Sequence, residues 1–341
     1  MTEIKRIAID TSKSVFTLHG VDDAGRAVLR RNLRRGELVR FFEGLPPVEV
    51  ALEACGGSHH WGRALSAVGH QVRLIPPQYV KPFVKRSKND RNDAEAIAVA
   101  AAQPSIGSVP IKSVEQQAAA MLLSVRELLV RQRTQLVNAV RGHAAEMGVV
   151  APLGEKGFKE LRTEIAAADE AAVPAPAKQA ITLLGREVER IEVRLRSIEA
   201  RLMQHHKANP LSRRLAAIPG IGPIGALNLA LRVEARQFAS ARHFAAWLGL
   251  VPRESSTAGR QRLGGISRAG DERLRQLLVL GATAVIQHAK PGRPATSQWL
   301  INLLSRKPRK LAAVALANKM ARIVWAMMTS GEAYRPAPAA D

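Results

Sequence analysis

The chain has 341 residues, of which 46% are hydrophobic, so we expect two or three folded domains rather than a disordered polypeptide. It carries 51 Lys and Arg against 29 Asp and Glu, a formal charge of +22 that favours a polyanion, by default nucleic acid, as the partner. Cys55 is the only cysteine, which excludes disulfides within the chain and zinc sites built from cysteines.

No membrane-spanning helix and no secretory signal are expected. The most apolar long stretch, residues 311–328, is interrupted by Lys319 and Arg322. The first residues place Glu3 and Asp10 around a short apolar run and lack the apolar core of a signal peptide. The expected location is a bacterial-type cytoplasm, in association with the nucleoid.

The first hundred residues alternate between short β-type runs and helical stretches. Residues 4–20 contain two β-type runs separated by a polar break, which predicts a hairpin. Further strands are predicted at 27–33, 48–52 and 71–75, and helices at 36–43, at 60–68 and from about residue 90. This order, βββαβαβα, predicts an α/β domain over residues 1–103.

Four acidic residues stand at strand ends or at a helix start in this domain. Asp10 follows the first strand, Glu53 ends a later strand, and Asp90 and Asp93 begin the last helix three positions apart. Taken singly, these positions are also typical of a turn, a loop cap and a solvated helix N-terminus. Together, the carboxylates can converge on one or two hard cations that activate the attack on a phosphodiester, as in ribonuclease H-like nucleases. We therefore predict a metal site.

A basic cluster precedes the last two acids. Lys85, Arg86 and Lys88 come just before Asp90. Such a cluster is also typical of a solvated surface, but beside a phosphodiester-cleaving site it favours contact with a nucleic-acid backbone.

The middle of the chain, residues 104–209, is predicted to be a linker followed by helices. A long helix is expected from about 114 to 147, and Pro152 with an Ala-rich stretch interrupts it. Apolar residues then recur three and four apart, which predicts a coiled coil; they are Ile181, Leu184, Val188, Ile191, Leu195, Ile198 and Leu202. This seam can pack on the preceding helix of the same chain or on a second protomer. We expect both, and hence a homo-oligomer.

Residues 215–227 have the pattern of a helix-hairpin-helix turn. Gly220 and Gly222 would free backbone N–H groups near a helix start to bind a phosphate without reading sequence. The alternative is a tight turn between two core helices.

A polar, glycine-rich loop with many arginines follows, up to a helix that begins near Asp271. Its hydroxyl residues are flanked by basic residues suited to phosphate contact, which are Arg253, Arg260, Arg262 and Arg268. One serine can act as a nucleophile if a base or metal is brought to it, although a phosphate-binding loop is the simpler interpretation. A basic amphipathic helix at 306–328 is expected to pack on this mostly helical domain of residues 210–330, before a disordered tail at 331–341.

The ordered set of motifs resembles the DEDD transposases of the one-hundred-and-ten family of bacterial insertion sequences, which are related to pilin-gene inverting DNA invertases. The resemblance covers nearly the whole chain. Its motifs are Ile-Asp-Thr-Ser-Lys at 9–13, Leu-Glu-Ala-Cys-Gly-Gly at 52–57, Lys-Asn-Asp-Arg-Asn-Asp-Ala-Glu-Ala at 88–96, Ile-Pro-Gly-Ile-Gly-Pro at 218–223, and Leu-Gly-Leu-Val-Pro-Arg followed by Ser-Ser-Thr-Ala-Gly at 248–259.

The resemblance implies a RuvC-like, ribonuclease H-like domain whose Asp10, Glu53, Asp90 and Asp93 hold Mg²⁺, with Mn²⁺ as a substitute. It further implies a coiled coil, a second transposase domain with a catalytic serine, and a structured RNA from the element that pairs with donor and target DNA. The serine of one subunit is expected to work with the acids of another, in a dimer or tetramer.

Two departures from the family pattern concern the site. Asn89 stands where a threonine is common, and Ala258 stands where a glycine is common. The alignment of the following Thr-x-Gly-Arg residues makes Ser256 the expected nucleophile, while Ser255 stays an alternative.

The sequence is also compatible with two other functions, a junction nuclease that uses only the acids and a non-catalytic nucleic-acid-binding protein.

Overall fold

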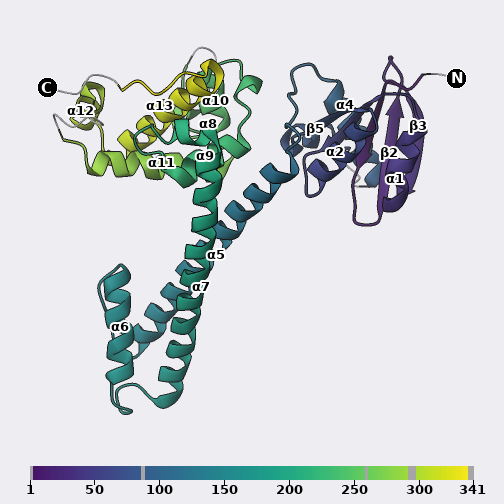
Figure 1. The fold of residues 1–341 in the computed structure, drawn as a ribbon. Helices are drawn as coiled ribbons and strands as arrows, with labels where there is room; N and C mark the ends of the chain where they lie inside the picture. The colour runs from purple at the N-terminus through teal and green to yellow at the C-terminus, as the bar shows by residue number, and fades with distance from the viewer. Residues whose placement is uncertain (1–2, 86–88, 258–259, 291–296, 337–341) are drawn as a thin grey trace. The chain divides into compact units, whose positions relative to one another are not determined.

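The computed structural model describes residues 3–85, 89–257, 260–290 and 297–336. The chain divides into two compact units, Met1–Gln116 and Gln117–Asp341 (Figure 1). The mixed α/β class expected from the sequence is confirmed, with strands concentrated in the first unit and helices in the second.

The first unit is built on a mixed sheet of strand order β3-β2-β1-β4-β5 over its described residues. β1 (Arg6–Asp10), β2 (Val15–Val21) and β3 (Ala27–Arg34) form an antiparallel meander. β4 (Glu49–Glu53) then pairs in parallel with β1, and β5 (Gln71–Ile75) in parallel with β4. The strands predicted from the sequence are thus all present, and β1 and β4 end at the same edge of the sheet.

Helices cover both faces of this sheet. Alternate residues such as Ile7, Ile9 and Phe16 face α1 (Leu38–Glu43) and α2 (Ser58–Ala67), where they form one core cluster. The residues between them, such as Ala8, face α4 (Asp90–Ala102). The buried side of α4 is mostly alanine, so this helix packs closely against β1 and β2. Its first turn therefore lies over the end of β1.

Three short helical turns connect the elements of this unit. They are η1 (Arg35–Glu37), α3 (Pro77–Val80) and η2 (Lys81–Phe83).

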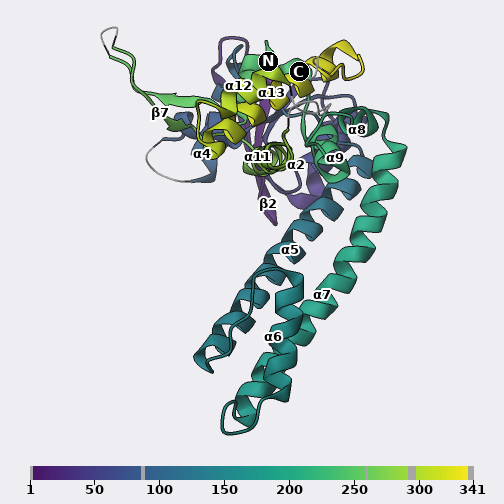
Figure 2. The same cartoon turned by 90° about the vertical axis from the view of Figure 1, so that its left-hand side faces the viewer.

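The second unit begins with two long helices that lie side by side, α5 (Val114–Glu146) and α7 (Ala175–Ala208) (Figures 1 and 2). The predicted seam of α7 faces inward, with Leu184 and Ile198 partly buried and the other five residues buried. Ion pairs Arg126–Glu199 and Arg133–Glu192 join the two helices. The seam is thus satisfied within one chain at least, while a coiled coil with a second protomer stays a prediction.

The sequence interpretation missed a helix between these two. Residues 155–167, which we expected to interrupt the helical region, form α6 (Glu155–Ala167). Phe158, Leu161 and Ile165 recur three and four apart and pack against the far ends of α5 and α7. The alanines on either side of this stretch obscured the apolar period.

The rest of the second unit is a helical core. It contains α8 (Pro210–Leu215), α9 (Pro223–Arg232), η3 (Ala235–Gln237), α10 (Ala241–Trp247), α11 (Glu272–Gln287), α12 (Gln298–Leu304) and α13 (Arg309–Ser330). α13 is long and apolar enough to span a membrane by length and composition alone. Its buried face, with Met320 and Val324, belongs to the core formed with α10 and α11.

A β-hairpin replaces most of the expected polar loop. β6 (Pro252–Glu254) and β7 (Leu263–Ile266) pair antiparallel, and the Thr257–Arg260 bridge continues the ladder outward. Figure 2 shows this hairpin extending as an arm beyond the helices of its unit. Leu263 is 56% exposed, so the arm is held by its backbone ladder rather than by a core.

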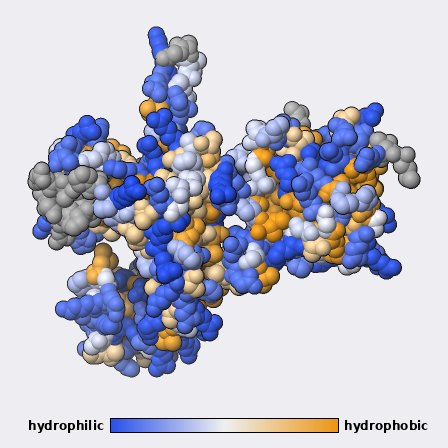
Figure 3. All heavy atoms as spheres, turned by 45° about the horizontal axis from the view of Figure 1, so that its top comes forward, coloured by the Kyte–Doolittle hydropathy of each residue, from blue (hydrophilic) through white to orange (hydrophobic). Residues whose placement is uncertain are grey.

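The chain end is partly attached to this helical core. Tyr334 packs against the core, and the Arg214 guanidinium donates to the carbonyl oxygen of Gly331 at 2.8 Å. These residues belong to the tail that we expected to be disordered, and residues 337–341 of that tail lie outside the described residues. On the face drawn in Figure 3, hydrophilic residues cover most of both units.

Candidate metal centre and serine hairpin

Asp10 and Glu53 are the last residues of two neighbouring parallel strands. Ile9 of β1 pairs with Leu52 of β4, so the next residue on each strand is an acid at the same edge of the sheet. Ala8 faces α4, and the side chain of Asp10, two residues on, therefore projects to the face that α4 covers. The sheet thus presents one carboxylate beneath the start of α4, with a second on the adjoining strand.

The other two acids lie in the first turn of α4. Asn89 is the N-cap, and its side-chain oxygen accepts a hydrogen bond from the backbone N–H of Asn92 at 2.9 Å. Asparagine caps helices as well as threonine does, so this departure from the family pattern preserves the helix start. Asp90 and Asp93 lie three residues apart and hence on neighbouring parts of one face. The capped helix start fixes both above the end of β1.

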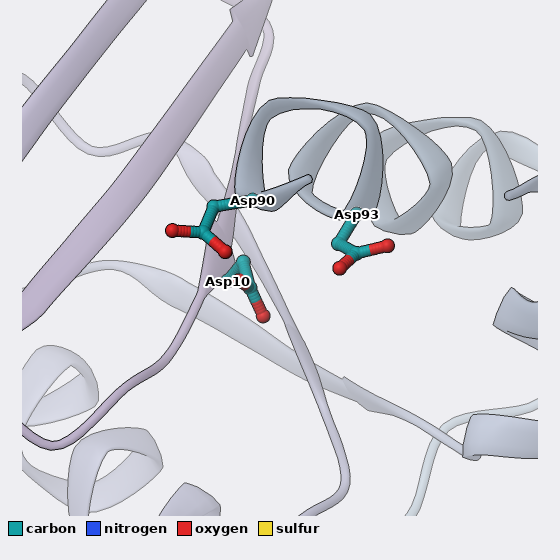
Figure 4. Close-up of side chains that lie close together, drawn as sticks. All are labelled: Asp10, Asp90 and Asp93. Carbon is teal, nitrogen blue, oxygen red and sulfur yellow. The ribbon is translucent and has the colours of Figure 1, made fainter. Parts of the chain in front are cut away.

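The three aspartates form one cluster (Figure 4). One carboxylate oxygen from each of Asp10, Asp90 and Asp93 lies within 4.8 Å of the others. Among the described residues no histidine or cysteine joins this cluster. Glu53 stays outside the cluster but interacts with it electrostatically. The charge of Glu53 raises the pKa of Asp10, and the charge of Asp93 raises the pKa of Glu53. The structure therefore brings three of the four predicted ligands together, with the fourth beside them.

The electrostatics of the cluster are those of crowded anions. Burial, followed by the charges of Asp93, Asp90 and Glu53, raises the pKa of Asp10 from 3.8 to about 6. Burial also raises the pKa of Glu53, with Asp93 as the second cause. The neighbouring carboxylates thus oppose ionisation of Asp10 and Glu53, and a bound cation would remove that opposition.

The donor set fits a hard divalent cation. Carboxylate oxygens are the ligands that Mg²⁺ prefers, at about 2.1 Å, so two oxygens across such an ion lie about 4.2 Å apart. The spacing within the aspartate cluster, at most 4.8 Å, is close to that value. Asp10, Asp90 and Asp93 would hold the ion, with Glu53 as the electrostatic neighbour of the cluster.

We expect cation binding to weaken as the pH falls. With the pKa of Asp10 at about 6, the folded metal-free protein holds a proton there at pH 5 that the cation must displace. Mn²⁺ affinity measured by calorimetry should therefore drop about tenfold between pH 7 and pH 5. In the same metal-free protein, the stabilising contribution of this group is complete below pH 3.8 and is lost as the pH rises through about 6.

Asp10→Asn provides the control for this titration. The substitution removes the titrating group, so the remaining affinity should change less with pH than in the wild type. Wild-type affinity that is constant from pH 7 to pH 5 would contradict the assignment.

The basic lead-in to the acids is described only in part. Lys85 lies 2.8 Å from Glu95 of α4 and pairs with it. Arg86 and Lys88 lie outside the described residues. The pair with Glu95 lowers the positive charge that Lys85 offers to a phosphate, so the expected backbone contact at Lys85 stays a prediction.

The two glycines of the expected helix-hairpin-helix turn have different surroundings. Gly220 has a φ of +85°, and a Cβ there would lie 2.7 Å from the carbonyl oxygen of Gly281 in α11. The turn thus packs backbone to backbone on α11, which was the structural alternative. Gly222 is exposed before α9, and no described atom lies within 4 Å of the place of a Cβ there. Of the two, Gly222 is the one open to a phosphate.

Ser256 lies on the exposed arm and has two hydrogen-bonding partners. Its hydroxyl donates to a carboxylate oxygen of Glu254 at 2.7 Å, and its oxygen accepts from the backbone N–H of Arg262 at 3.3 Å. Ser255 instead uses its backbone N–H, which donates to the carbonyl oxygen of Arg262. A carboxylate thus lies where it can take the proton of Ser256, a contact that favours Ser256 over Ser255, while the nucleophile itself stays a prediction.

The predicted phosphate-binding arginines lie on or near the same arm. Arg253, Arg260, Arg262 and Arg268 are all exposed. Arg268 adopts a left-handed backbone, with φ at 58°. Ala258 and Gly259, between Ser256 and Arg260, lie outside the described residues.

Sequence reasoning missed Glu254 because it treated this region as a loop. On a strand, residues two apart share a face, so a hairpin prediction would have paired Glu254 with Ser256. Sequence reasoning also left out Arg91 as a candidate site residue, although it stands between Asp90 and Asp93 in the sequence.

Two family models match this chain. A DEDD transposase model of the IS110 group matches residues 7–148, and the model described as Transposase IS116/IS110/IS902 family matches residues 212–297. The putative transposase y4pF/y4sB of Sinorhizobium fredii is 52% identical over 98% of this chain and 87% of its own length. The chain belongs to the IS116/IS110/IS902 transposase family.

Other relatives of the transposase agree with this assignment. A probable family 20 transposase of Pseudomonas aeruginosa is 47% identical over 98% of the chain and 99% of its own length. The transposase for insertion sequence element IS1111A of Coxiella burnetii is 39% identical over 98% of the chain and 92% of its own length. The protein is thus a DNA transposase, an enzyme, and the non-catalytic alternative no longer applies. A DEDD domain implies a divalent metal, and the aspartate cluster lies within the segment that matches it.

Proposed function

We propose that this transposase cuts and rejoins DNA at a cation held by Asp10, Glu53, Asp90 and Asp93, with Ser256 as the nucleophile. Two features carry the proposal, one in each unit. One is the aspartate cluster, with oxygens within 4.8 Å, in a ribonuclease H-like strand order. The other is the Ser256 hydroxyl donated to Glu254 at 2.7 Å. Mg²⁺ is the proposed ion, with Mn²⁺ as a substitute.

The proposed chemistry is a transesterification. The Oγ of Ser256 bonds to the scissile phosphorus while the phosphorus–oxygen bond to the departing DNA strand breaks. The hydroxyl proton passes to the Glu254 carboxylate, and the departing oxygen takes a proton from water. A cation held by the acids would supply charge stabilisation for the phosphate oxygens. In rejoining, the oxygen of a DNA hydroxyl bonds to phosphorus and passes its proton to water, while the bond from phosphorus to the Oγ of Ser256 breaks. Oγ then takes back the proton from Glu254, and the energy of the first broken bond is conserved.

A structured RNA encoded by the element is proposed to choose the DNA sequences by base pairing. The surface supports this in one respect, because the exposed arginines of the arm can contact backbone phosphates, which carry no sequence information. Gly222 and the basic residues Lys85, Arg86 and Lys88 are proposed to add further backbone contacts. A protein that contacts mainly backbones needs another source of sequence choice, and paired RNA supplies it.

A dimer or tetramer is proposed as the active form. Met121, Val125 and Leu128 recur on one side of α5 and are each more than 40% exposed, which favours a helix partner from a second protomer. In such an assembly, Ser256 of one subunit would serve the acids of another. The coiled coil, the three-part division at residues 103 and 209, and a location at the nucleoid of a bacterial cytoplasm belong to the same proposal.

The test is a joining assay with purified transposase, Mg²⁺, donor and target DNA, and RNA transcribed from the noncoding part of the element. Joined product is expected only when RNA and both DNAs are present. An RNA of the same length and scrambled sequence is the control. Equal joining without RNA, or with the scrambled RNA, would exclude guidance while leaving the two catalytic features to be tested by mutation.

A junction nuclease that uses only the acids is the second candidate. It is favoured by one observation, that the aspartate cluster is assembled within the first unit without any residue of the arm. This enzyme would leave free DNA ends and no protein–DNA link. The fate of the DNA in a Ser256 variant separates the two mechanisms.

A further inference from the structure

Polar side chains continue across the sheet from the metal cluster. In the strand register, Asp10 of β1 pairs with Thr17 of β2, and Thr17 pairs with Asn32 of β3. The next row contains His19 of β2, paired with Arg30 of β3. Phe16 and Leu33 belong to the core on the α1 side, so the residues that alternate with them face the α4 side. Asp10, Thr17 and Asn32 thus form a row on one face, about 10 Å from end to end.

This face holds a pocket of about 250 Å³ beside the cluster. Its floor contains Thr17 and His19, which are 6% and 7% exposed. Its walls contain Arg30 and Asn32 from β3 and Arg91 from the first turn of α4. Arg91 lies in the chain between Asp90 and Asp93, so one helical turn serves both the cluster and the pocket.

The guanidinium groups of Arg30 and Arg91 form no ion pair and no side-chain hydrogen bond within the part of the chain that the structure describes. The carboxylate of Glu95, which is paired with Lys85, acts on Arg30 only through its charge. The neighbouring basic residues differ in this respect. Lys85 is paired with Glu95, and the guanidinium of Arg31 lies over the ring of Phe41, on the opposite face of the sheet. Two guanidinium groups above a polar floor are suited to an oxyanion with several acceptor oxygens.

We propose that this pocket binds a backbone phosphate of the DNA strand that is cut, next along the strand from the phosphate at the aspartate cluster. Arg30, Arg91 and Asn32 would then be positioning residues that set which phosphodiester reaches the cluster. The proposal rests on the function proposed above, in that the cluster is taken as the place of cutting. None of these three residues is among the proposed metal ligands, so the role in positioning the DNA is separate from metal binding.

The first measurement is DNA binding by the full chain in metal-free buffer, with a fluorescent DNA duplex over a range of salt. Arg30→Gln and Arg91→Gln are each expected to weaken binding about tenfold or more at low salt, since each removes a charge-assisted contact. Each should also reduce the slope of log affinity against log salt by about one. Arg40→Gln is the matched control, because Arg40 is an exposed arginine of α1, on the opposite face of the sheet and outside the pocket; this variant should bind like the wild type. Equal binding by all three variants would overturn the proposal.

The second measurement locates the phosphate. Duplexes with a single uncharged methylphosphonate at successive positions should show one position near the cut where the wild type loses affinity. The Arg30→Gln, Arg91→Gln double variant should show no further loss there, because both changes remove the same contact. A loss that persists in the double variant would contradict the assignment. Melting temperatures of all variants establish that they fold.

The two proposals fail in different ways. If Asp93→Asn still joins DNA while the pocket variants lose binding, the proposed function fails and the pocket stands. If the pocket variants bind DNA like the wild type while Asp93→Asn abolishes joining, the pocket fails and the function stands.

Discussion

Asp93→Asn is expected to abolish cutting and joining of DNA, with a rate loss of at least about 10³-fold. Asp93 provides one of the three clustered oxygens and is the largest charge contribution to the raised pKa of Asp10. Its loss removes a ligand, and cation stabilisation of a phosphodiester transition state is worth several kcal/mol, of which about 4 kcal/mol corresponds to that factor. Single-turnover cleavage of a labelled donor DNA in Mg²⁺ measures the loss.

The same substitution should leave the fold intact. Because Asp93 opposes ionisation of its neighbours, the metal-free variant should melt at the wild-type temperature or above it. Asp23→Asn is the matched control, since Asp23 is an exposed acid of the same unit whose side chain is 81% exposed. Cleavage that survives in Asp93→Asn, or that fails equally in Asp23→Asn, would contradict the metal assignment.

Ser256→Ala is expected to remove the covalent protein–DNA link and to reduce joining by at least about 10³-fold. The substitution deletes the oxygen that forms the bond to phosphorus and leaves the aspartate cluster unchanged. The link is detected as labelled DNA that migrates with denatured protein. Ser255→Ala is the neighbouring control and should retain both the link and joining, because the Ser255 contact to Arg262 is made by its backbone.

Glu254→Gln tests the proton acceptor on the arm. The amide cannot take the hydroxyl proton, so the rate of link formation should fall about 10²-fold while DNA affinity stays the same. If Ser256→Ala joins DNA at the wild-type rate, the serine mechanism is wrong. If it cuts DNA without forming a link, the enzyme is the acid-only nuclease.

The sequence was most informative about the site where acidic residues stand at the ends of strands or at the start of a helix. Asp10 and Glu53 end buried strands, and such ends meet at one sheet edge whenever the strands are parallel neighbours. Asp90 and Asp93 follow a strong N-cap, so their helix position was also foreseeable. The strand order itself follows from a hairpin followed by crossovers, which leaves few arrangements. The convergence of Asp10, Asp90 and Asp93 was therefore predictable from the sequence alone.

Features set by cross-strand register or by weak patterns were not predictable in the same way. The pocket depends on Thr17 and His19 standing opposite Asn32 and Arg30, and a shift of one residue in β3 would turn both partners away. The arm has few β-branched or aromatic residues, so its pairing left no strand signal in the sequence. The close contact of Gly220 with Gly281 joins positions about sixty residues apart, which no local pattern records.

The β6–β7 arm carries Ser256 but contributes little to the stability of the fold. Because nearly all of its side chains are exposed, swinging the arm uncovers very little apolar surface. Few apolar contacts therefore fix the outer part of the arm, which carries Ser256, against the rest of its unit. Under the proposed mechanism, the moment of cutting is decided by the complex on which the arm comes to rest. Under that mechanism, stray breaks in the host chromosome are avoided because Ser256 meets the acids only in the complete complex with nucleic acid, and not because the isolated subunit holds the arm away.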